Sequence, residues 1–354
     1  MRILLTGANG VMGRAAISAL VAAGHEVRGL IRSDSAAAVV ETDGAVPVFG
    51  DVLDHASMVA AMRDCDVVVN FATHIPVGLK MFAPGSLNRV NRIRTIGSQV
   101  VAEAAHEAGV GRIVQQSLSF IYVARGDEWI DESTPVDVTA VSEPLVIAES
   151  NARQLEQSGA TAVCLRYGLI CGDDPNSQYF LNRARRRKAI GFGDPGSWMH
   201  VIHPDDVGSS TVAALTAPSG AYNVGAEPIT RRGYVDAIAQ AAGRTEGRFY
   251  RDWLFGVTAD KLELLARPQR VSSQLFTDRT GWKPSRPVLT KEWFMAADEA
   301  EKSSRAARER AARLLGDLMP TTTSDETAEG WGETETSSRD EDLRRDVPPH
   351  HGKD

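Results

Sequence analysis

Short apolar runs alternate with amphipathic stretches from residue 1 to about residue 170. This alternation is typical of βα units arranged on a parallel sheet. The run Val67-Val68-Val69 is apolar without a break, which fits a strand buried on both faces. The predicted strands are Arg2–Thr6, Glu26–Ile31, Val46–Phe49, Val67–Phe71, Arg112–Ser117 and Thr161–Arg166. The predicted helices between them are Val11–Ala23, Ala56–Met62, Arg92–Ala108 and Ile147–Gln157.

The pattern changes twice further along the chain. From about residue 171 to residue 300 it loosens into Pro-Gly-rich turns, with sheet elements expected around Trp198–His203 and Ala221–Val224. Residues 299–318 then form an Arg/Ala/Glu-rich stretch that predicts a helix. Residues 321–354 are rich in Thr, Ser, Glu, Asp and Pro and almost free of apolar side chains, so we predict a disordered acidic tail.

Composition excludes several classes of protein. With 43% apolar and 24% charged residues, the chain can bury a sizeable core, so disorder throughout is excluded. Its three cysteines are scattered and form no CxxC pair, which excludes a disulfide scaffold and favours a reduced cytoplasm. No apolar run approaches the roughly 20 residues of a membrane span, and the apolar run at Ile3–Leu5 is too short for a signal peptide.

The charge of the chain is concentrated in its tail. The net charge is −7, and residues 321–354 carry −6 of it, with ten acids and four bases. The remaining 320 residues therefore carry only −1. A nearly neutral body gives no electrostatic reason to expect a nucleic acid as partner.

The strongest local signal is a glycine-rich turn between the first strand and the first helix. Glycines stand at positions 7, 10 and 13 of the run Thr6-Gly7-Ala8-Asn9-Gly10-Val11-Met12-Gly13. A tight turn, a close approach of backbone to a diphosphate, and close packing of helix on strand each exclude a side chain. The helix N-terminus supplies free N–H groups and a positive dipole end for the anion. The turn therefore predicts a dinucleotide site, although its spacing is G-x-x-G-x-x-G and not the commoner G-x-G-x-x-G.

From this turn onward the chain resembles the extended short-chain dehydrogenase/reductase family, the NAD(P)-dependent epimerase/dehydratase-like group. The resemblance covers residues 1 to about 295, and its landmarks follow in the family's order. Besides the glycine turn they are Gly24–Val27, Gly50–Val52, Asn70–Ala72, Val90–Asn91, Leu165–Gly168, His203–Val207, Tyr222–Gly225 and Thr280–Pro284.

The resemblance implies a doubly wound α/β fold, a parallel-sheet Rossmann domain with a smaller C-terminal substrate lobe. The Rossmann domain would span residues 1–170 and be completed by about 206–225. The lobe would comprise residues 171–205 and 226–300, followed by a terminal helix over 301–320 and the tail over 321–354. The ligand cleft would lie between domain and lobe.

The resemblance also places a nicotinamide cofactor. The turn residues expected to bind it are Gly7, Asn9, Gly10, Val11, Met12 and Gly13. Asp51 and Val52 would flank the adenine, and Phe71 and Ala72 would line the ribose and nicotinamide path. Asn91, at the opening of the long helix, completes the set.

The end of the second strand decides between the two nicotinamide cofactors. The NAD-preferring pattern places an acid there, but this chain has Ile31 followed by Arg32. Isoleucine cannot accept hydrogen bonds from ribose hydroxyls, whereas an arginine favours a 2′-phosphate. We therefore predict NADP, with NAD as the alternative.

The family's proton-handling residues are missing. The family uses a tyrosine with a lysine four residues later, because the lysine lowers the pKa of the phenol. None of the six tyrosines here is followed by lysine at that spacing. The alignment places Leu145 at the tyrosine position and Glu149 at the lysine position. The upstream hydroxyl position falls on Leu118, between Ser117 and Ser119.

Four residues are candidates to replace that machinery at the carboxyl ends of the strands: Tyr122, Glu149, Ser119 and His74. Each also has a simpler interpretation. Tyr122 could be a packed strand-end aromatic, and His74 a solvated loop residue. Glu149 could be an exposed carboxylate that pairs with Arg153 at i+4. His200 and His203 lack metal-ligand spacing around the Asp205-Asp206 pair, so no metal is predicted.

We rank three functions for this sequence. First is an atypical extended short-chain dehydrogenase/reductase that binds NADP(H) and acts at a hydroxyl or carbonyl carbon of a small molecule, in a tailoring step of biosynthesis. Second is a non-redox cyclase, dehydratase or isomerase on the same scaffold, and third a cofactor-sensing regulator. The substrate is not specified by the sequence. The oligomeric state is not specified either, and a homodimer is one alternative, because members of this family usually pair through the helices around 92–108 and 147–157.

Overall fold

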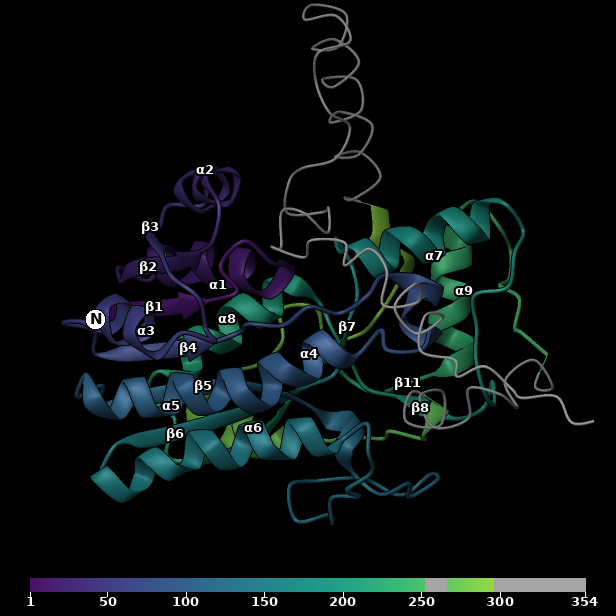
Figure 1. Cartoon of the computed structure of the whole chain (residues 1–354). Helices are drawn as coiled ribbons and strands as arrows, with labels where there is room; N and C mark the ends of the chain where they lie inside the picture. Colours follow the sequence, from purple (N-terminus) through teal and green to yellow (C-terminus); the bar gives the residue numbers. More distant parts are fainter. Residues whose placement is uncertain (252–265, 296–354) are drawn as a thin grey trace, which may run out of the picture. The chain divides into compact units, whose positions relative to one another are not determined.

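The computed structural model describes residues 1–251 and 266–295, which lie within one compact unit spanning residues 1–306 (Figure 1). The predicted helix over 301–320 and the predicted tail over 321–354 lie outside the described residues. The predicted boundary near residue 170 between domain and lobe stays a prediction.

The core of the unit is a seven-stranded sheet in the order β10-β6-β5-β4-β1-β2-β3, with every neighbouring pair parallel. This doubly wound order confirms the predicted α/β Rossmann fold. All six predicted strands form, with ends that differ by one residue at most. The strands are β1 (Arg2–Thr6), β2 (Glu26–Ile31), β3 (Val46–Phe49), β4 (Val67–Asn70), β5 (Arg112–Leu118), β6 (Thr161–Tyr167) and β10 (Gly220–Val224).

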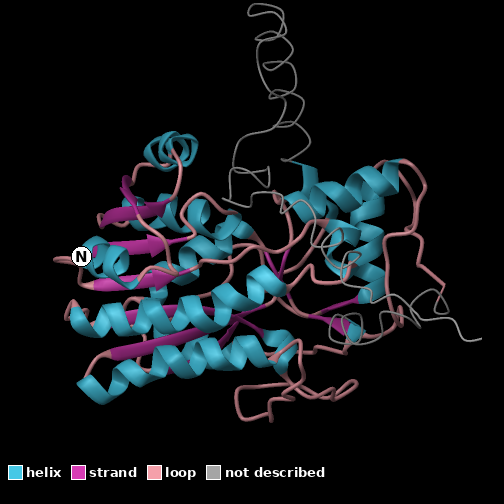
Figure 2. Cartoon of the chain, in the orientation of Figure 1, coloured by secondary structure: helices cyan, strands magenta, loops and turns pink. Residues whose placement is uncertain are grey.

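Helices cover both faces of the sheet (Figure 2). Ile3 and Leu5 of β1 pack toward one face with α1 (Val11–Ala22), α2 (Asp34–Thr42) and α8 (Pro204–Ala214). Leu4, between them, packs toward the other face with α3 (His55–Met62), α5 (Ser98–Glu107) and α6 (Glu143–Arg153). The period of two along the strand therefore divides the core into two layers.

The long helix after β4 differs from its prediction. Instead of one regular helix over Arg92–Ala108, the chain forms α4 (Asn88–Arg92), a π-helical turn η2 (Ile93–Gly97), and then α5. Figure 1 shows α4 and α5 as one continuous rod. A π-helical turn is uncommon and is found disproportionately at functional sites.

The C-terminal part of the described chain has its own apolar cluster, which includes Leu181, Tyr234, Ile238, Trp293 and Phe294. The helices α7 (Pro175–Arg185) and α9 (Arg231–Ala241) supply this cluster, whereas α11 (Gln274–Thr280) packs through Phe276 into the cluster that covers the central sheet. The predicted sheet element around Trp198–His203 is split at His200. Its first half, β8 (Trp198–Met199), pairs with β11 (Ile229–Thr230), and its second half, β9 (Val201–Ile202), pairs with β7 (Leu169–Ile170). The short helical turns are η1 (Gly78–Phe82), η3 (Ser119–Ile121), η4 (Gln154–Ser158) and η6 (Lys291–Phe294).

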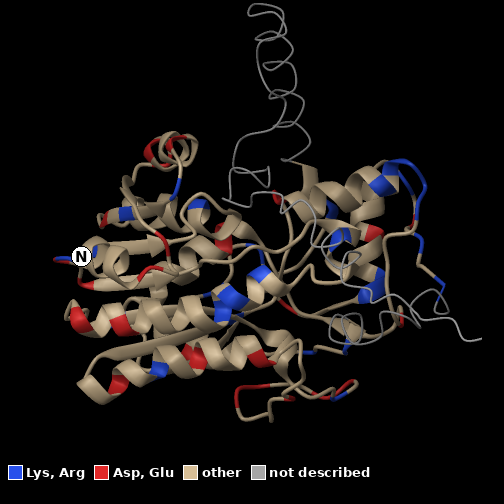
Figure 3. Cartoon of the chain, viewed as in Figure 1, with Lys and Arg blue, Asp and Glu red and all other residues tan. Residues whose placement is uncertain are grey.

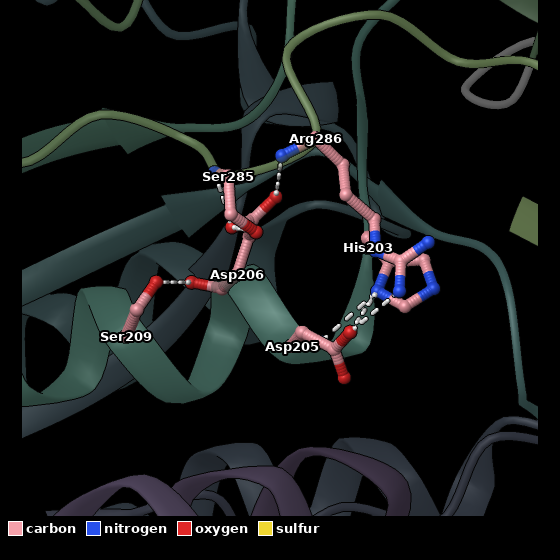
Figure 4. Close-up of polar contacts among 6 residues, drawn as sticks. All are labelled: His203, Asp205, Asp206, Ser209, Ser285 and Arg286. Atoms are coloured by element: carbon pink, nitrogen blue, oxygen red, sulfur yellow. Dashed lines mark hydrogen bonds and ion pairs between the residues drawn. The ribbon is translucent and has the colours of Figure 1, made fainter.

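The start of α8 holds the segment that follows α11 (Figure 4). The carboxylate of Asp206 accepts hydrogen bonds from the amide and the hydroxyl of Ser285, both at 2.7 Å, and from the amide of Arg286 at 3.1 Å. The Arg286 guanidinium also lies 3.0 Å from the Asp205 carboxylate. These acids therefore hold together two segments that are distant in the sequence.

Candidate functional site

The glycine turn joins β1 to α1 so tightly that two of its glycines admit no side chain. Gly7 has a φ of +66°, and a Cβ atom there would lie 2.5 Å from the carbonyl oxygen of Phe71. A Cβ atom at Gly13 would lie 2.1 Å from the carbonyl oxygen of Gly7. The Gly10 amide closes the turn on the same oxygen at 3.0 Å.

The N-terminus of α1 is left open for an anion. Gly10 is its N-cap, no side chain caps the helix, and its first turn contains no acid. Asn9 and Gly10 are exposed, Val11 is half-buried, and Met12 is buried in the core. The unbonded N–H groups and the positive end of the helix dipole therefore suit a diphosphate.

A chain of buried polar groups fixes the strand ends behind the turn. The Thr6 hydroxyl donates to Asn70 at 2.6 Å and accepts from the amides of Phe71 and Ala72, both at 3.1 Å. The Asn70 amide in turn donates to Gln115 at 2.8 Å. These bonds hold the carboxyl ends of β1, β4 and β5 together, which is the edge where ligands bind in open α/β sheets.

Two buried hydroxyls near that edge lack a hydrogen-bond partner in the described part of the chain. They are Oγ1 of Thr73, just after β4, and Oγ of Ser117 in β5. A buried polar group without a partner costs about 1–3 kcal/mol, and a bound molecule that reaches it removes that cost. The glycine turn, the open helix end and these hydroxyls together fit a nicotinamide dinucleotide.

The other predicted cofactor residues lie at the same sheet edge. Arg32 and Asp51 follow the adjacent strands β2 and β3, and Ala72 follows β4, on the other side of β1. Arg32 is exposed. Val52 and Asn91 are half-buried, Val52 in the segment after β3 and Asn91 on α4.

Phe71 contributes its backbone to the turn. Its ring is buried and packs edge-on against Tyr167, with the ring centres 6.2 Å apart.

At the family's lysine position the chain has a buried ion pair. Glu149 on α6 binds the guanidinium of Arg166 on β6 through two hydrogen bonds of 2.9 and 2.7 Å. Both side chains are about nine-tenths buried. The simpler interpretation of Glu149, an exposed carboxylate paired with Arg153, is therefore wrong, because Arg153 lies 3.8 Å from Glu156 instead.

Tyr122 belongs to the same buried network. Its hydroxyl accepts from Arg166 at 2.8 Å and donates to Asn223 at 2.7 Å. Burial raises the pKa of Tyr122 to about 12, against the opposing effect of the Arg166 charge. The phenol is therefore held in its protonated form, with its proton directed at Asn223. Its predicted role in proton transfer stays a prediction.

Ser119 is buried at the end of β5 and is bonded to a histidine from a distant segment. Its Oγ atom lies 3.0 Å from Nδ1 of His200. On the other side of the ring, Nε2 lies 3.4 Å from Oγ of Ser273. Burial lowers the pKa of His200 to about 3, so the ring is neutral at physiological pH.

The neutral state of His200 makes stability depend on pH. Because the ring binds a proton near pH 6.5 when unfolded and near 3 when folded, the free energy of unfolding should fall as pH drops through that window. We expect a loss of about 2 kcal/mol between pH 7.5 and pH 5.0 relative to His200→Gln. Urea unfolding of both proteins at the two pH values measures it, and equal pH dependence would refute it. The buried carboxyl of Asp174 has its pKa raised to about 6 by burial and acts with the opposite sign, but it is present in both proteins.

His74 lies in the loop after β4, and its side chain is half-buried. Tyr122, Glu149 and Ser119 are all buried. The structure thus brings Tyr122 and Glu149 together through Arg166, and links Ser119 to His200. Of the four proton-handling candidates, His74 is the one whose side chain is partly exposed.

Sequence reasoning missed the partners that complete these contacts. Arg166 and Asn223 were noticed as parts of family landmarks, but nothing in one sequence pairs either with Tyr122. His200 was considered only as a metal ligand. Pairings over 44 to 101 positions become visible only once the strands are placed side by side.

Comparison with known proteins supports a nicotinamide cofactor. The family model described as NAD(P)H-binding matches residues 7–218. A 3-diazoavenalumate denitrifying reductase from a Streptomyces species is 28% identical over 81% of this chain and 97% of its own length. A 4-hydroxy-2-methyl-3-oxo-4-farnesyl-3,4-dihydroquinoline-1-oxide ketoreductase from Stigmatella aurantiaca is 28% identical over 69% of this chain and 74% of its own.

Solved structures share the fold. The human epimerase family protein SDR39U1, in complex with NADPH, matches with a TM-score of 0.71 and 23% identity over 84% of this chain and 99% of its own. The dTDP-glucose 4,6-dehydratase DesIV from Streptomyces venezuelae, with NAD bound, matches with a TM-score of 0.71 and 20% identity over 87% and 98%. Within residues 1–251 and 266–295, no helix has the length and apolarity that crossing a membrane requires.

Proposed function

The chain belongs to the NAD(P)H-binding family, and from this premise we propose that it is an NADPH-dependent reductase of a small carbonyl compound. The observation that carries the proposal is the open N-terminus of α1 behind a turn that excludes side chains at Gly7 and Gly13. Two relatives that match most of the chain are a reductase and a ketoreductase, which supports reduction over other chemistry of this fold.

We assign a role to each group of the site from its contacts. A bound nicotinamide cofactor would supply the hydride for the carbonyl carbon. The turn from Gly7 to Gly13 and the α1 N-terminus bind its diphosphate. The unpartnered hydroxyls of Thr73 and Ser117 bind and orient polar groups of the ligands in the cleft. The proton for the carbonyl oxygen comes from His74, because histidine is a common general acid in catalysis and this side chain is half-buried in the loop after β4.

The test is a nicotinamide absorbance assay of the full chain with NADPH and a panel of aromatic ketones and quinones. We expect oxidation of NADPH in step with formation of the alcohol, and His74→Asn should slow it by about a hundredfold without changing NADPH affinity. The matched control is His55→Asn, because His55 on α3 is also half-buried and lies 3.6 Å from Glu107. A product formed without consumption of NADPH would overturn the proposal.

That last outcome would favour the second candidate, a non-redox enzyme on the same scaffold. Leu145 can neither donate nor accept a proton, and Glu149 is engaged by Arg166. These two features remove the family's proton relay and motivate this candidate.

We propose that Arg32 selects NADPH over NADH. An exposed arginine directly after β2 suits a 2′-phosphate, because charge-assisted hydrogen bonds contribute about 1.5–3 kcal/mol. Arg32→Ala should therefore weaken NADPH binding by about tenfold or more and leave NADH binding unchanged. Calorimetric titration measures both affinities. Arg14→Ala, which removes an exposed partner of Asp43, serves as the control, and an equal loss for NADPH and NADH would refute the assignment.

A further inference from the structure

The π-helical turn η2 lies between two parts of the predicted cofactor cleft. On one side, the position of a Cβ atom at Gly97 is 3.5 Å from Cγ2 of Val52, in the segment predicted to flank the adenine. On the other side, the Asn151 amide of α6 donates to the Thr95 carbonyl at 3.2 Å and to Ser98 at 2.8 Å. The turn therefore lies between the segment predicted to flank the adenine and the helix α6, which carries Glu149.

This turn carries a buried arginine, Arg94, whose charge has no partner within residues 1–251 and 266–295. Arg94 is 8% exposed, and its Nε atom is buried without a hydrogen-bond partner. Within the described residues its side chain makes no ion pair, and burial lowers its pKa to about 10. The guanidinium of Arg166 is equally buried, but it is bound by the Glu149 carboxylate, which compensates its charge.

An unpaired buried cation is costly, and proteins usually supply a counter-charge for it. Two further arginines, Arg89 and Arg92, precede it on α4, and Figure 3 shows blue segments on this helix. A second rare feature coincides with it, because the helix departs from regular geometry at this turn. Both observations indicate that the missing counter-charge is supplied from outside the described residues.

We propose that Arg94 binds an oxyanion of a molecule held in the cleft, either a phosphate of the nicotinamide cofactor or a carboxylate of the substrate. The planar guanidinium matches both groups through paired hydrogen bonds, and it retains its charge after desolvation. The inference rests on the proposed cofactor cleft for its location. It needs no turnover, so it can be tested apart from the reaction.

The test compares the full-length wild type with Arg94→Met, which keeps the apolar stem, and Arg94→Lys, which keeps the charge. Arg153→Met, at an exposed arginine of α6, is the matched control. Melting temperatures and affinities are measured with NADPH, with pyrophosphate, and with benzoate in the presence of NADPH. Sodium chloride of equal ionic strength is the reference.

We expect Arg94→Met to melt at the wild-type temperature or above it without ligand, because it removes an uncompensated buried charge. We also expect it to bind at least one probe tenfold more weakly, with Arg94→Lys between the two and Arg153→Met unchanged. Weakened NADPH and pyrophosphate binding would identify a cofactor phosphate as the anion, and weakened benzoate binding alone would identify a substrate carboxylate.

Three results would overturn the inference. The first is unchanged binding of all three probes by Arg94→Met. The second is that none of the three probes stabilises the wild type. The third is a lower melting temperature of unliganded Arg94→Met, which would show that the protein itself balances this charge. Failure of the proposed function is a distinct result. In that case the wild type does not bind NADPH, whereas pyrophosphate or benzoate still stabilises it through Arg94.

Discussion

Replacing Glu149 with glutamine is expected to destabilise the protein by about 3–5 kcal/mol. The carboxylate of Glu149 makes two charge-assisted hydrogen bonds to Arg166, and both side chains are about nine-tenths buried. Burial opposes the charge of Arg166, yet the bonds and charge of Glu149 raise its pKa above the ordinary value. The variant therefore leaves a buried guanidinium with no compensating negative charge. Urea unfolding at neutral pH measures the loss.

The matched control for this prediction is Glu156→Gln. Glu156 also faces an arginine, Arg153, but at 3.8 Å and with that arginine largely exposed. Its loss should stay below about 1 kcal/mol. Glu149→Lys, which restores the family's residue type, should be worse than Glu149→Gln because it puts a second cation beside Arg166. Equal losses for Glu149→Gln and Glu156→Gln would contradict this account of the network.

The second large effect is expected from Gly13→Ala, which should weaken NADPH binding by more than about a hundredfold, or roughly 3 kcal/mol. The new Cβ atom would stand 2.1 Å from the carbonyl oxygen of Gly7, so the turn must move by a large part of an ångström. Both the diphosphate cradle and the packing of α1 on β1 depend on that turn. Calorimetric titration with NADPH measures the loss of affinity.

Gly24→Ala separates this effect from a general loss of stability. Gly24 follows α1 with a φ of +82°, but a Cβ atom there would meet nothing within 4 Å. The variant should therefore cost about 1 kcal/mol of backbone strain and leave NADPH affinity unchanged. If Gly13→Ala also binds NADPH like the wild type, the diphosphate does not lie at this turn.

The sequence was sufficient for the parts of the molecule that depend on local pattern. The short apolar runs at Val67–Val69 and in β1 predicted strand positions to within a residue, because burial of a parallel strand leaves an unbroken apolar signature. The glycine turn was also predicted from the sequence, because only glycine fits where backbone segments approach each other this closely.

Other features depend on contacts between distant residues. The π-helical turn at Ile93–Gly97 has no proline or local break that would reveal it. The pairing of Glu149 with Arg166 joins positions 17 apart on a helix and a strand, while the sequence suggested a helical i+4 pair. In each case tertiary packing, which no local pattern encodes, decided the outcome.

The central claim is that the chain binds NADPH at the turn between β1 and α1 and uses it as a reductant. Calorimetric titration of the full chain with NADPH, NADP, NADH and NAD tests it most directly. The account predicts micromolar or tighter binding with a preference for the phosphorylated forms, weakened more than about a hundredfold by Gly13→Ala and retained by Gly24→Ala. Absence of binding by all four would show that the glycine turn is inherited architecture, and the non-redox enzyme would replace the reductase as the first hypothesis.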